Sequence, residues 1–441
     1  MSKDIEIPQG KRTKFYRFFE ILPAFLSYGA IILMIVLSII SPFWASVYLI
    51  FIISTLLVKA VGVAYRTFGG YRKMNQALKV DWEDRLTQLE NPHESYCRIK
   101  DYSQKDSRSF DFKKHCENLR RISAEDNFLK PSRVINAVIV AAYNEPYEVI
   151  QPTIESLKNA KYPKDNLVVF LAYEERGGKD IEETAYRLKT EFLHIFKDFE
   201  IVKHPKDLPN EVVGKGGNIT YAGKWLEQYL QQEEIAFSDV IVTTMDCDNK
   251  PHKYYFDYVT YEYITHEDRK HLSFQPICLF TNNIWDVPAP MRVVATGNSF
   301  WNIISSMRPY SLRNFASHSQ PMNALVEMNF WSTRTIVEDG HQYWRSYFYF
   351  DGNYEVVPIF VPIYQDAVLA NSYKKTLKAQ FIQLRRWSYG ASDVAYVGNN
   401  IFNKNRTVKF WPSLARFVRL LDGHVTQACI ALIVAFGGWA P

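Results

Sequence analysis

The pattern of apolar and polar positions divides the chain into apolar segments near its two ends and a mixed region between them. No charged residue stands between Glu20 and Lys59, and this stretch is long enough for two bilayer crossings of about 20 helical residues each. Ser41-Pro42 predicts a turn near its middle, because proline interrupts helical hydrogen bonding. We therefore predict a transmembrane hairpin with helices over Leu22–Ile40 and Trp44–Tyr65.

Basic residues on both sides of this hairpin predict its orientation. Positive charge concentrates on the cytoplasmic side of membrane helices, and here it flanks the hairpin while the turn carries none. We therefore expect an integral membrane protein of the plasma membrane, with the large polar region in the cytosol. The flanking basic residues are Lys3, Lys11, Arg12, Lys14 and Arg17 before the hairpin and Lys59, Arg66, Arg72, Lys73 and Lys79 after it.

The C-terminal segment has a different apolar pattern. Over Val408–Leu421, aromatic and aliphatic residues are interleaved with Lys409, Arg416 and Arg419, which is typical of a helix lying in the membrane interface. Val425–Pro441 is uncharged but slightly short for one crossing. We expect a further transmembrane helix to start there. The chain is then either a fragment of a longer protein, which we favour, or ends with one marginal helix.

Between the apolar ends, short apolar runs alternate with amphipathic stretches. This alternation predicts an α/β fold with a mainly parallel sheet covered by helices on both faces. A linker and one lead-in helix are expected over Asp81–Lys130. The expected strands are Val134–Ala142, Asn166–Ala172, Glu200–Lys203, Val240–Thr244 and Ser273–Phe280, and the expected helices are Pro146–Asn159, Asp180–Phe196, Asn218–Gln232 and His252–His266. The predicted domains are 1–66 (N-terminus and two transmembrane helices), 67–133 (linker and lead-in helix), 134–370 (catalytic domain), 371–424 (interfacial helices) and 425–441 (start of a further transmembrane helix).

The composition narrows the classes of function. Of 441 residues, 52 are Lys or Arg and 47 are Asp or Glu, and the net charge of +5 is too small on this length to indicate a nucleic-acid-binding protein. The five cysteines include no CxxC pair. Neither a disulfide framework nor a zinc knuckle is therefore expected, and a reducing compartment fits.

Polar segments follow four of the expected strands. Ligands of open α/β sheets bind beyond the carboxyl ends of the strands, so these segments are expected to line one site. Their acids, lysine and glycine-rich turn suit a phosphorylated ligand held with a divalent metal. The four segments are Ala142–Pro146, Tyr173–Gly177, Gly214–Asn218 and Asp246–Asp248.

Two of these segments carry a specific chemistry. Asp246 and Asp248 share one side if the strand tip is extended, and hard carboxylate oxygens bind Mg²⁺ or Mn²⁺. An ordinary acidic loop is the alternative, disfavoured here by the buried-looking strand before it. Lys215, followed by glycines at an expected helix start, could hold a diphosphate through its charge and backbone N–H groups. The alternative is a plain turn, and the spacing of a Walker A loop is absent.

Two later motifs contain further candidate residues. Glu338 and Asp339 precede an aromatic-rich stretch, and they either cap a helix or include a general base for an acceptor hydroxyl. On another expected helix, Gln383, Arg386 and Trp387 share one face. Arginine suits a diphosphate leaving group, and tryptophan offers a flat surface for a sugar ring. The alternative is a basic helix face near lipid.

In their order, these motifs resemble those of membrane-integrated family 2 glycosyltransferases, the group containing cellulose, chitin and hyaluronan synthases. The match runs over Val134–Tyr389 and consists of Ala-Tyr-Asn-Glu, an acidic second-strand end, Lys-Gly-Gly-Asn, Asp-Cys-Asp, Glu-Asp and Gln-x-x-Arg-Trp. The resemblance implies a GT-A fold, a UDP-sugar donor and a divalent metal, Mg²⁺ or Mn²⁺. It also implies inversion of the anomeric centre.

The resemblance further implies a role for each motif residue. Tyr143 and Glu145 would line the nucleoside pocket, with Glu174 or Glu175 completing it. Lys215 would lie near the diphosphate, Asp246 would contact the nucleotide, and Asp246 and Asp248 would hold the metal. Asp339, beside Glu338, would be the base. Gln383 and Arg386 would neutralise the departing UDP, and Trp387 would support the acceptor sugar. A turn on the acceptor side would be formed by Thr296, Gly297 and Asn298. Two features depart from the family: glutamates replace the usual aspartates after the second strand, and the chain ends before the spans that form a polymer channel.

We therefore predict a membrane-bound inverting glycosyltransferase that moves a sugar from a UDP-sugar to a saccharide acceptor in polysaccharide synthesis. One alternative is transfer of a single sugar to a polyprenyl phosphate or another lipid. Another, from a different class, is an inactive nucleotide-binding scaffold of a membrane complex. The expected partners are the donor, a saccharide or lipid-linked acceptor and membrane lipids, with a membrane partner subunit left open and no nucleic acid.

Overall fold

The computed structural model describes residues 5–100, 109–125 and 127–437. The chain divides into two compact units, which we call the helical unit and the sheet unit. The helical unit comprises Met1–Phe68, Trp344–Asn353 and Ile382–Pro441, and the sheet unit comprises Gly69–Tyr343 and Tyr354–Phe381.

Within the described residues, the sheet unit is built on one eight-stranded sheet with the order β3-β2-β1-β4-β7-β6-β8-β5. Strands β3, β2, β1 and β4 run parallel to one another, and β6 runs parallel to β8. Antiparallel pairing joins β7 to β4 and β6, and β5 to β8. The strands are β1 (Ile135–Ala142), β2 (Leu167–Glu174), β3 (Asp198–His204), β4 (Val240–Asp246), β5 (Lys250–Pro251), β6 (Leu272–Phe280), β7 (His318–Pro321) and β8 (Glu355–Gln365).

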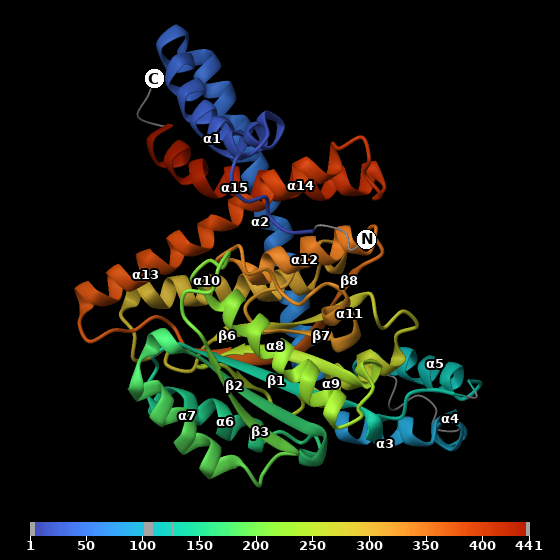
Figure 1. Ribbon diagram of the computed structural model, residues 1–441. Helices are drawn as coiled ribbons and strands as arrows, with labels where there is room; N and C mark the ends of the chain where they lie inside the picture. Colours follow the sequence, from blue (N-terminus) through green and yellow to red (C-terminus); the bar gives the residue numbers. More distant parts are fainter. Residues whose placement is uncertain (1–4, 101–108, 126, 438–441) are drawn as a thin grey trace. The chain divides into compact units, whose positions relative to one another are not determined.

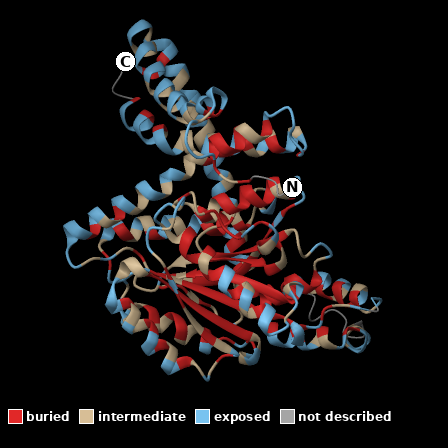
Figure 2. Ribbon diagram, viewed as in Figure 1, coloured by how far each residue is buried: buried red, intermediate tan, exposed pale blue. Residues whose placement is uncertain are grey.

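Strands β1, β2 and β4 are buried on both faces, as Figure 2 shows, which explains their continuous apolar sequences, whereas the edge strand β3 is partly exposed. Alternate residues of β1 point to opposite faces, so that Val138 and Val140 belong to one hydrophobic cluster and Ala137 and Ile139 to the other. One face is covered by α6 (Tyr147–Lys158), α7 (Lys179–Phe192) and α9 (Tyr255–Thr265), and the other by α8 (Lys215–Gln232) and α11 (Met322–Glu327) (Figure 1). The predicted α/β fold with a mainly parallel, helix-flanked sheet is confirmed.

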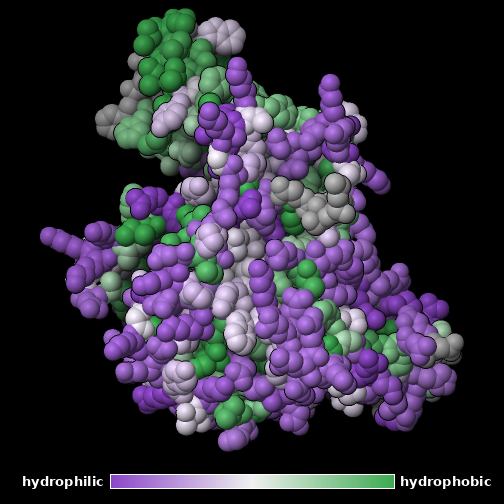
Figure 3. All heavy atoms as spheres, in the orientation of Figure 1, coloured by the Kyte–Doolittle hydropathy of each residue, from purple (hydrophilic) through white to green (hydrophobic). Residues whose placement is uncertain are grey.

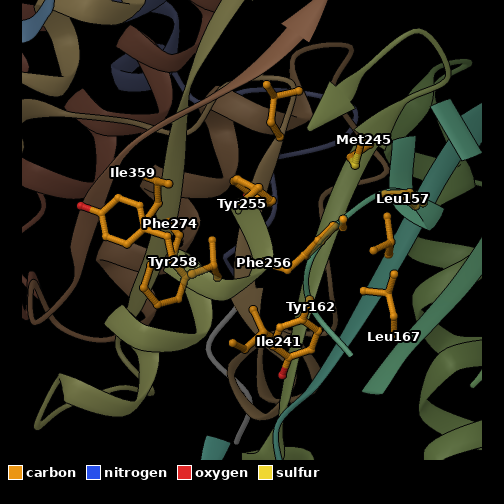
Figure 4. Packing of buried hydrophobic residues seen from close by; sticks show 14 of the residues in the cluster. Leu157, Tyr162, Leu167, Ile241, Met245, Tyr255, Phe256, Tyr258, Phe274 and Ile359 are labelled. Atoms are coloured by element: carbon orange, nitrogen blue, oxygen red, sulfur yellow. The ribbon is translucent and has the colours of Figure 1, made fainter. Parts of the chain in front are cut away.

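All five predicted strands and all four predicted helices of this unit are present, with ends shifted by a few residues. Strands β5, β7 and β8 were not predicted. Three helices lie among the described residues of the segment expected to hold one lead-in helix: α3 (Trp82–Glu90), α4 (Pro92–Lys100) and α5 (Phe112–Ile122). That expectation is wrong because α3 belongs to the core, where the Trp82 ring stacks on Tyr258 of α9 with 3.7 Å between centroids. Figure 4 shows Tyr258 packed near Phe274 and Ile359.

The helical unit contains α1 (Lys14–Ile40), most of α2 (Pro42–Ala77), α14 (Asp393–Ile401) and α15 (Phe410–Gly437). The Thr13 hydroxyl accepts a hydrogen bond from the backbone N–H of Tyr16 and caps α1, and α2 begins at Pro42. α1 packs on α14 and α15. The Phe19 ring lies so close to Gly398 that a Cβ there would be 2.6 Å from it, and it stacks on Phe402 with 5.5 Å between centroids.

Among the described residues, α1, α2 and α15 are long and apolar enough to cross a membrane. Figure 3 shows hydrophobic side chains gathered over the hairpin of α1 and α2. The two helices of the predicted hairpin are therefore confirmed as helices of membrane-spanning length. The prediction of an interfacial helix followed by a separate span is wrong, because α15 continues unbroken from Phe410 to Gly437. Residues 438–441 of the predicted span lie outside the described residues.

The segment before α1 folds onto other parts of the helical unit. Ile5 and Ile7 are buried, and the Tyr396 hydroxyl of α14 donates to the Ile5 carbonyl at 2.9 Å. The Glu6 carboxylate pairs with the Arg345 guanidinium at 2.6 Å. Arg345 lies in the second half of α12 (Glu338–Tyr349), the helix whose first turn contains the predicted base, Asp339.

Candidate active site

The carboxyl end of β4 carries the Asp-Cys-Asp motif. Asp246 is the last residue of β4, and its carbonyl accepts a hydrogen bond from the backbone N–H of Asn249 at 3.1 Å. This bond closes a turn over Cys247 and Asp248, so the predicted extended tip is wrong. In the amide orientation that satisfies its neighbours, the buried Asn249 side chain donates to Asp248 Oδ1 at 2.8 Å. The turn thereby holds the second carboxylate in place.

Lys215 is the first residue of α8 and reaches the Asp-Cys-Asp motif. Its Nζ donates to Asp246 Oδ1 at 2.6 Å and to the Ala316 carbonyl at 2.8 Å. Burial by itself lowers the pKa of Lys215, but the nearby carboxylates of Asp246, Glu338 and Asp339 outweigh it, and the pKa is raised. The lysine is therefore held as a cation among three acids.

The start of α12 brings Glu338 and Asp339 to the same place. A Cβ at Gly216, one residue after Lys215, would lie 3.1 Å from the Glu338 Cβ and would overlap the Ser332 carbonyl oxygen. Glu338 is buried and Asp339 is half-buried. Burial and the charge of Asp339 raise the pKa of Glu338 to about 8, although Lys215 opposes the shift. The shift favours the protonated form of Glu338, which lies beside a more exposed aspartate.

The surroundings of Asp248 fit a divalent cation. Burial, and then the charges of Asp246 and Asp366, raise the pKa of Asp248 to about 7, and a bound cation would offset this crowding of carboxylates. In the described ranges, no group of three or more His, Cys, Asp or Glu side chains is arranged to hold a metal without further ligands. Asp246 and Asp248 would therefore leave coordination positions for phosphate or water oxygens, as Mg²⁺ usually does.

The ends of β1 and β2 form a second group of predicted residues. The Tyr143 N–H donates to Glu145 Oε2 at 2.7 Å, and the Arg176 guanidinium lies 5.2 Å from the centre of the Tyr143 ring. Arg176 also pairs with the buried Glu174 carboxylate. Glu175 lies just beyond and accepts from the Lys206 N–H at 3.1 Å. This tip therefore presents an exposed aromatic ring with an arginine against it, and the charge of Glu174 is neutralised.

Asn218 holds these strand ends to the start of α8. Its buried side-chain amide donates to the carbonyl oxygens of Ala142, at 3.3 Å, and of Ala172, at 3.0 Å. The Asn of the Lys-Gly-Gly-Asn motif thus fastens the helix that carries Lys215 to β1 and β2.

Sequence reasoning missed the segment that enters β7. Its Ala316 carbonyl accepts from Lys215, and its Ser317 hydroxyl contacts the Asn249 amide. His318 accepts from the Trp331 indole N–H at 3.2 Å, and its Nδ1 lies 2.9 Å from the Phe315 carbonyl. Burial lowers the pKa of His318 to about 4, so the imidazole is neutral. The local sequence carries no apolar run, so composition offered no signal for it.

Two further groups of predicted residues lie on the helices α10 and α13. Thr296, Gly297 and Asn298 are inside the helix α10 (Ala289–Ser306), so the turn predicted for them is wrong. Their sequence contains no helix breaker except one glycine, which a helix tolerates. Gln383, Arg386 and Trp387 lie on α13 (Tyr373–Ser388) at the predicted helical spacing. They belong to the helical unit, and their approach to Asp248 and Asp339 of the sheet unit stays a prediction.

The comparisons with known proteins concern the fold. No protein-family description and no curated protein matches the sequence. The mannosyltransferase PcManGT from Pyrobaculum calidifontis, solved with GDP-Man and Mn²⁺, is 15% identical, with a TM-score of 0.44 over 83% of this chain and 87% of that one. TarS from S. aureus is 13% identical, with a TM-score of 0.35 over 70% of this chain and 87% of that one.

Glucosyl-3-phosphoglycerate synthase from Mycobacterium tuberculosis, solved with Mn²⁺, UDP and phosphoglyceric acid, is 13% identical. Its TM-score is 0.34, over 60% of this chain and 78% of that one.

Proposed function

We propose that this protein is a membrane-bound glycosyltransferase that moves a sugar from a UDP-sugar to a saccharide acceptor, with inversion at the anomeric carbon. The observation that carries the proposal is the meeting of Lys215, Asp246, Glu338 and Asp339, which come from three different elements. A cation enclosed by acids at the carboxyl edge of a parallel sheet suits a diphosphate, a divalent metal and a base in one site.

In the proposed reaction, Asp339 takes the proton from the acceptor hydroxyl. The raised pKa of Glu338 favours this division of roles, because it favours the protonated form of the buried glutamate and leaves the more exposed aspartate as the candidate base. The Asp339 carboxylate also lies in the first turn of α12, where the helix dipole favours a negative charge. The deprotonated hydroxyl would then attack the anomeric carbon opposite the departing UDP.

The same site offers groups for the diphosphate of the donor. Lys215 and the backbone N–H groups at the start of α8 would bind phosphate oxygens, and Tyr143 with Arg176 would contact the nucleoside. Mg²⁺ or Mn²⁺ held by Asp246 and Asp248 would neutralise charge on the leaving diphosphate. We assign Gln383 and Arg386 to the same leaving group and Trp387 to the acceptor sugar.

The proposed location is the plasma membrane, with the sheet unit in the cytosol. The helices α1 and α2 support membrane insertion by their length and composition. The basic residues that flank them support the orientation. Transfer to a polyprenyl phosphate or another lipid is the second candidate, because a site beside a membrane can reach a lipid-linked acceptor.

The proposal is tested with the full chain in detergent or proteoliposomes, supplied with a panel of UDP-sugars and Mn²⁺ or Mg²⁺. UDP release is measured, and the product is sized to separate a polymer from a short glycolipid. Asp339→Asn is expected to lower kcat by about 10²–10⁴-fold while the affinity for UDP with Mn²⁺ stays near that of the unchanged protein. The matched control is Asp180→Asn, an exposed position on α7, which should leave both quantities unchanged.

Three outcomes would count against the proposal. Equal turnover of Asp339→Asn and Asp180→Asn would contradict the assignment of Asp339 as the base. Absence of metal-dependent UDP binding in the unchanged protein would contradict a UDP-sugar as the donor. Tight UDP binding without transfer of any sugar would favour the inactive scaffold.

A further inference from the structure

The helix α10 of the sheet unit has an apolar stripe on each of two sides. One stripe, which includes Met291, Ala295 and Ile303, is buried against β6 and β8. The other contains Val293, Phe300 and Trp301, whose exposed fractions are 74%, 47% and 53%. These positions are seven and eight residues apart, so they lie on one face of the helix. The first stripe is therefore explained by packing inside the sheet unit, whereas the second is largely exposed up to Trp301, and Ile304, at its C-terminal end, is buried.

The last turns of α2 meet the C-terminal end of α10. At Gly70 of α2, a Cβ would lie 2.5 Å from Ile303 Cγ2 and 3.1 Å from Met307 Cγ, and at Gly69 it would lie 3.2 Å from Met307 Cε. Two glycines therefore allow α2 to contact α10 closely. These contacts all lie within the sheet unit.

The position of Gly70 along α2 relates this contact to the membrane. α2 is continuous from Pro42 to Ala77 and contains an apolar stretch of membrane-spanning length. Gly70 follows Arg66, the first arginine after that stretch, by about 6 Å along the helix axis. Tyr71, next to it, is exposed. Aromatic and basic residues in such an arrangement are typical of the membrane–water interface.

The other end of α10 carries the same combination of residues. Trp285, just before α10, is 80% exposed, and the Arg292 guanidinium lies 5.6 Å from its ring centre. Arg292 also donates to the carbonyl oxygens of Trp285 and Val287, each at 3.0 Å. Over its 18 residues, about 27 Å of helix, α10 thus combines an exposed apolar stripe with one arginine, which lies against a tryptophan just before the helix.

We propose that α10 is a membrane-contacting helix, with Val293, Phe300 and Trp301 immersed in the interface of a bilayer that contains anionic lipids. The proposal rests on α2 crossing that bilayer, and it does not depend on sugar transfer. Two other surroundings fit the exposed stripe less well. Contact with water would leave its apolar side chains unburied, and a bound saccharide would need polar side chains between the aromatic rings. On the exposed stripe of α10, all of whose residues are described, Thr296 is the side chain that could supply them.

This contact would fix the distance between the candidate active site and the membrane. The Ser299 hydroxyl of α10 accepts from the Phe280 N–H at the end of β6 at 3.0 Å. Two residues further, Asn282 donates to the Asp248 carbonyl at 3.2 Å. α10 is therefore joined by short links to the turn that carries the second aspartate of the motif. Its immersion would hold the site beside the bilayer surface.

The test uses nitroxide labels on the full chain, reconstituted into vesicles of phosphatidylcholine and phosphatidylglycerol. Val293→Cys and Trp301→Cys are labelled in a background with Cys97→Ser and Cys116→Ser, which leaves three buried cysteines. The matched control is Trp225→Cys, a tryptophan of α8 that is 51% exposed in the same unit. Val58→Cys, in the apolar part of α2, tests the membrane crossing separately.

Collisions of each label with oxygen, which concentrates in lipid, are compared with collisions with a water-soluble nickel chelate. The ratio of the two is expected to be at least about threefold higher at positions 293 and 301 than at position 225, since interfacial side chains leave water. Equal ratios would show that α10 faces water, and low collision with both quenchers would show a protein cover. Either result overturns the proposal, as does a water-exposed label at position 58. If the labels report lipid and no sugar is transferred, the transferase proposal fails and this one stands.

Discussion

Gly216→Ala tests the contact that brings the starts of α8 and α12 together. The added Cβ would overlap the Ser332 carbonyl oxygen and lie 3.1 Å from the Glu338 Cβ. A backbone oxygen cannot rotate away as a flexible side chain can. Either the start of α8 or the segment leading to Glu338 must therefore move by at least about half an ångström in a close-packed environment.

The expected effects on stability and activity differ in size. Overpacking costs about 1–3 kcal/mol, while alanine gains about 1 kcal/mol over glycine inside a helix. The free energy of unfolding should therefore fall by about 0–2 kcal/mol. A misplacement of 1 Å can cost about 10²-fold in rate, so a shift of half that size should lower kcat roughly tenfold or more. Lys215 lies on one side of this contact and Asp339 on the other, so the shift would change the position of the lysine relative to the proposed base.

The assay compares Gly216→Ala with Gly214→Ala in UDP release and in denaturant unfolding of the solubilised chain. Gly214 is the matched control because its backbone φ of 166° is extended, and a Cβ there would meet its nearest neighbour, in Ile336, at 4.0 Å. Gly214→Ala should leave both quantities nearly unchanged. If the two variants behave alike, the close contact between α8 and α12 does not position the site.

Three further substitutions test the electrostatics and hydrogen bonding of the fold. Burial, with acidic residues near the start of α3, raises the pKa of Asp257 on α9 to about 7 from 3.8. Its ionisation therefore destabilises the fold increasingly as pH rises from about 4 to 7. Asp257→Asn should raise the free energy of unfolding by up to about 4 kcal/mol at pH 8 and hardly at pH 4, and an equal gain at both would contradict this assignment. Glu6→Ala removes a carboxylate that pairs with the buried Arg345 and should cost about 2–4 kcal/mol in denaturant unfolding. The exposed-pair control Glu94→Ala should cost under about 1 kcal/mol, and similar losses in the two variants would contradict a larger contribution from the buried pair. Asn218→Ala removes two buried hydrogen bonds and should cost about 1–3 kcal/mol, so an unchanged unfolding midpoint would show that this amide does not fasten the strand ends.

The sequence by itself determined the elements whose signal is local. Strands β1, β2 and β4 are buried on both faces and therefore read as apolar runs, and the amphipathic helices between them follow from their spacing. The membrane-spanning length of α1 and α2 follows from the absence of charge. The sequence also predicted that the polar segments after these strands lie at one edge of the sheet, because parallel strands present their carboxyl ends at the same edge.

Only the tertiary structure decided the elements and contacts that depend on distant partners. Strand β7 consists of polar residues and proline, and it becomes a strand because β4 and β6 pair with it on both sides. Strand β8 contains Pro358 and Pro362, which argue against a strand locally, yet it lies between β6 and β5. The sequence likewise did not predict that Lys215 pairs with Asp246, or that α10 has one buried and one exposed apolar stripe. Periodicity describes one segment at a time, whereas these features arise when segments far apart in sequence meet and exclude water.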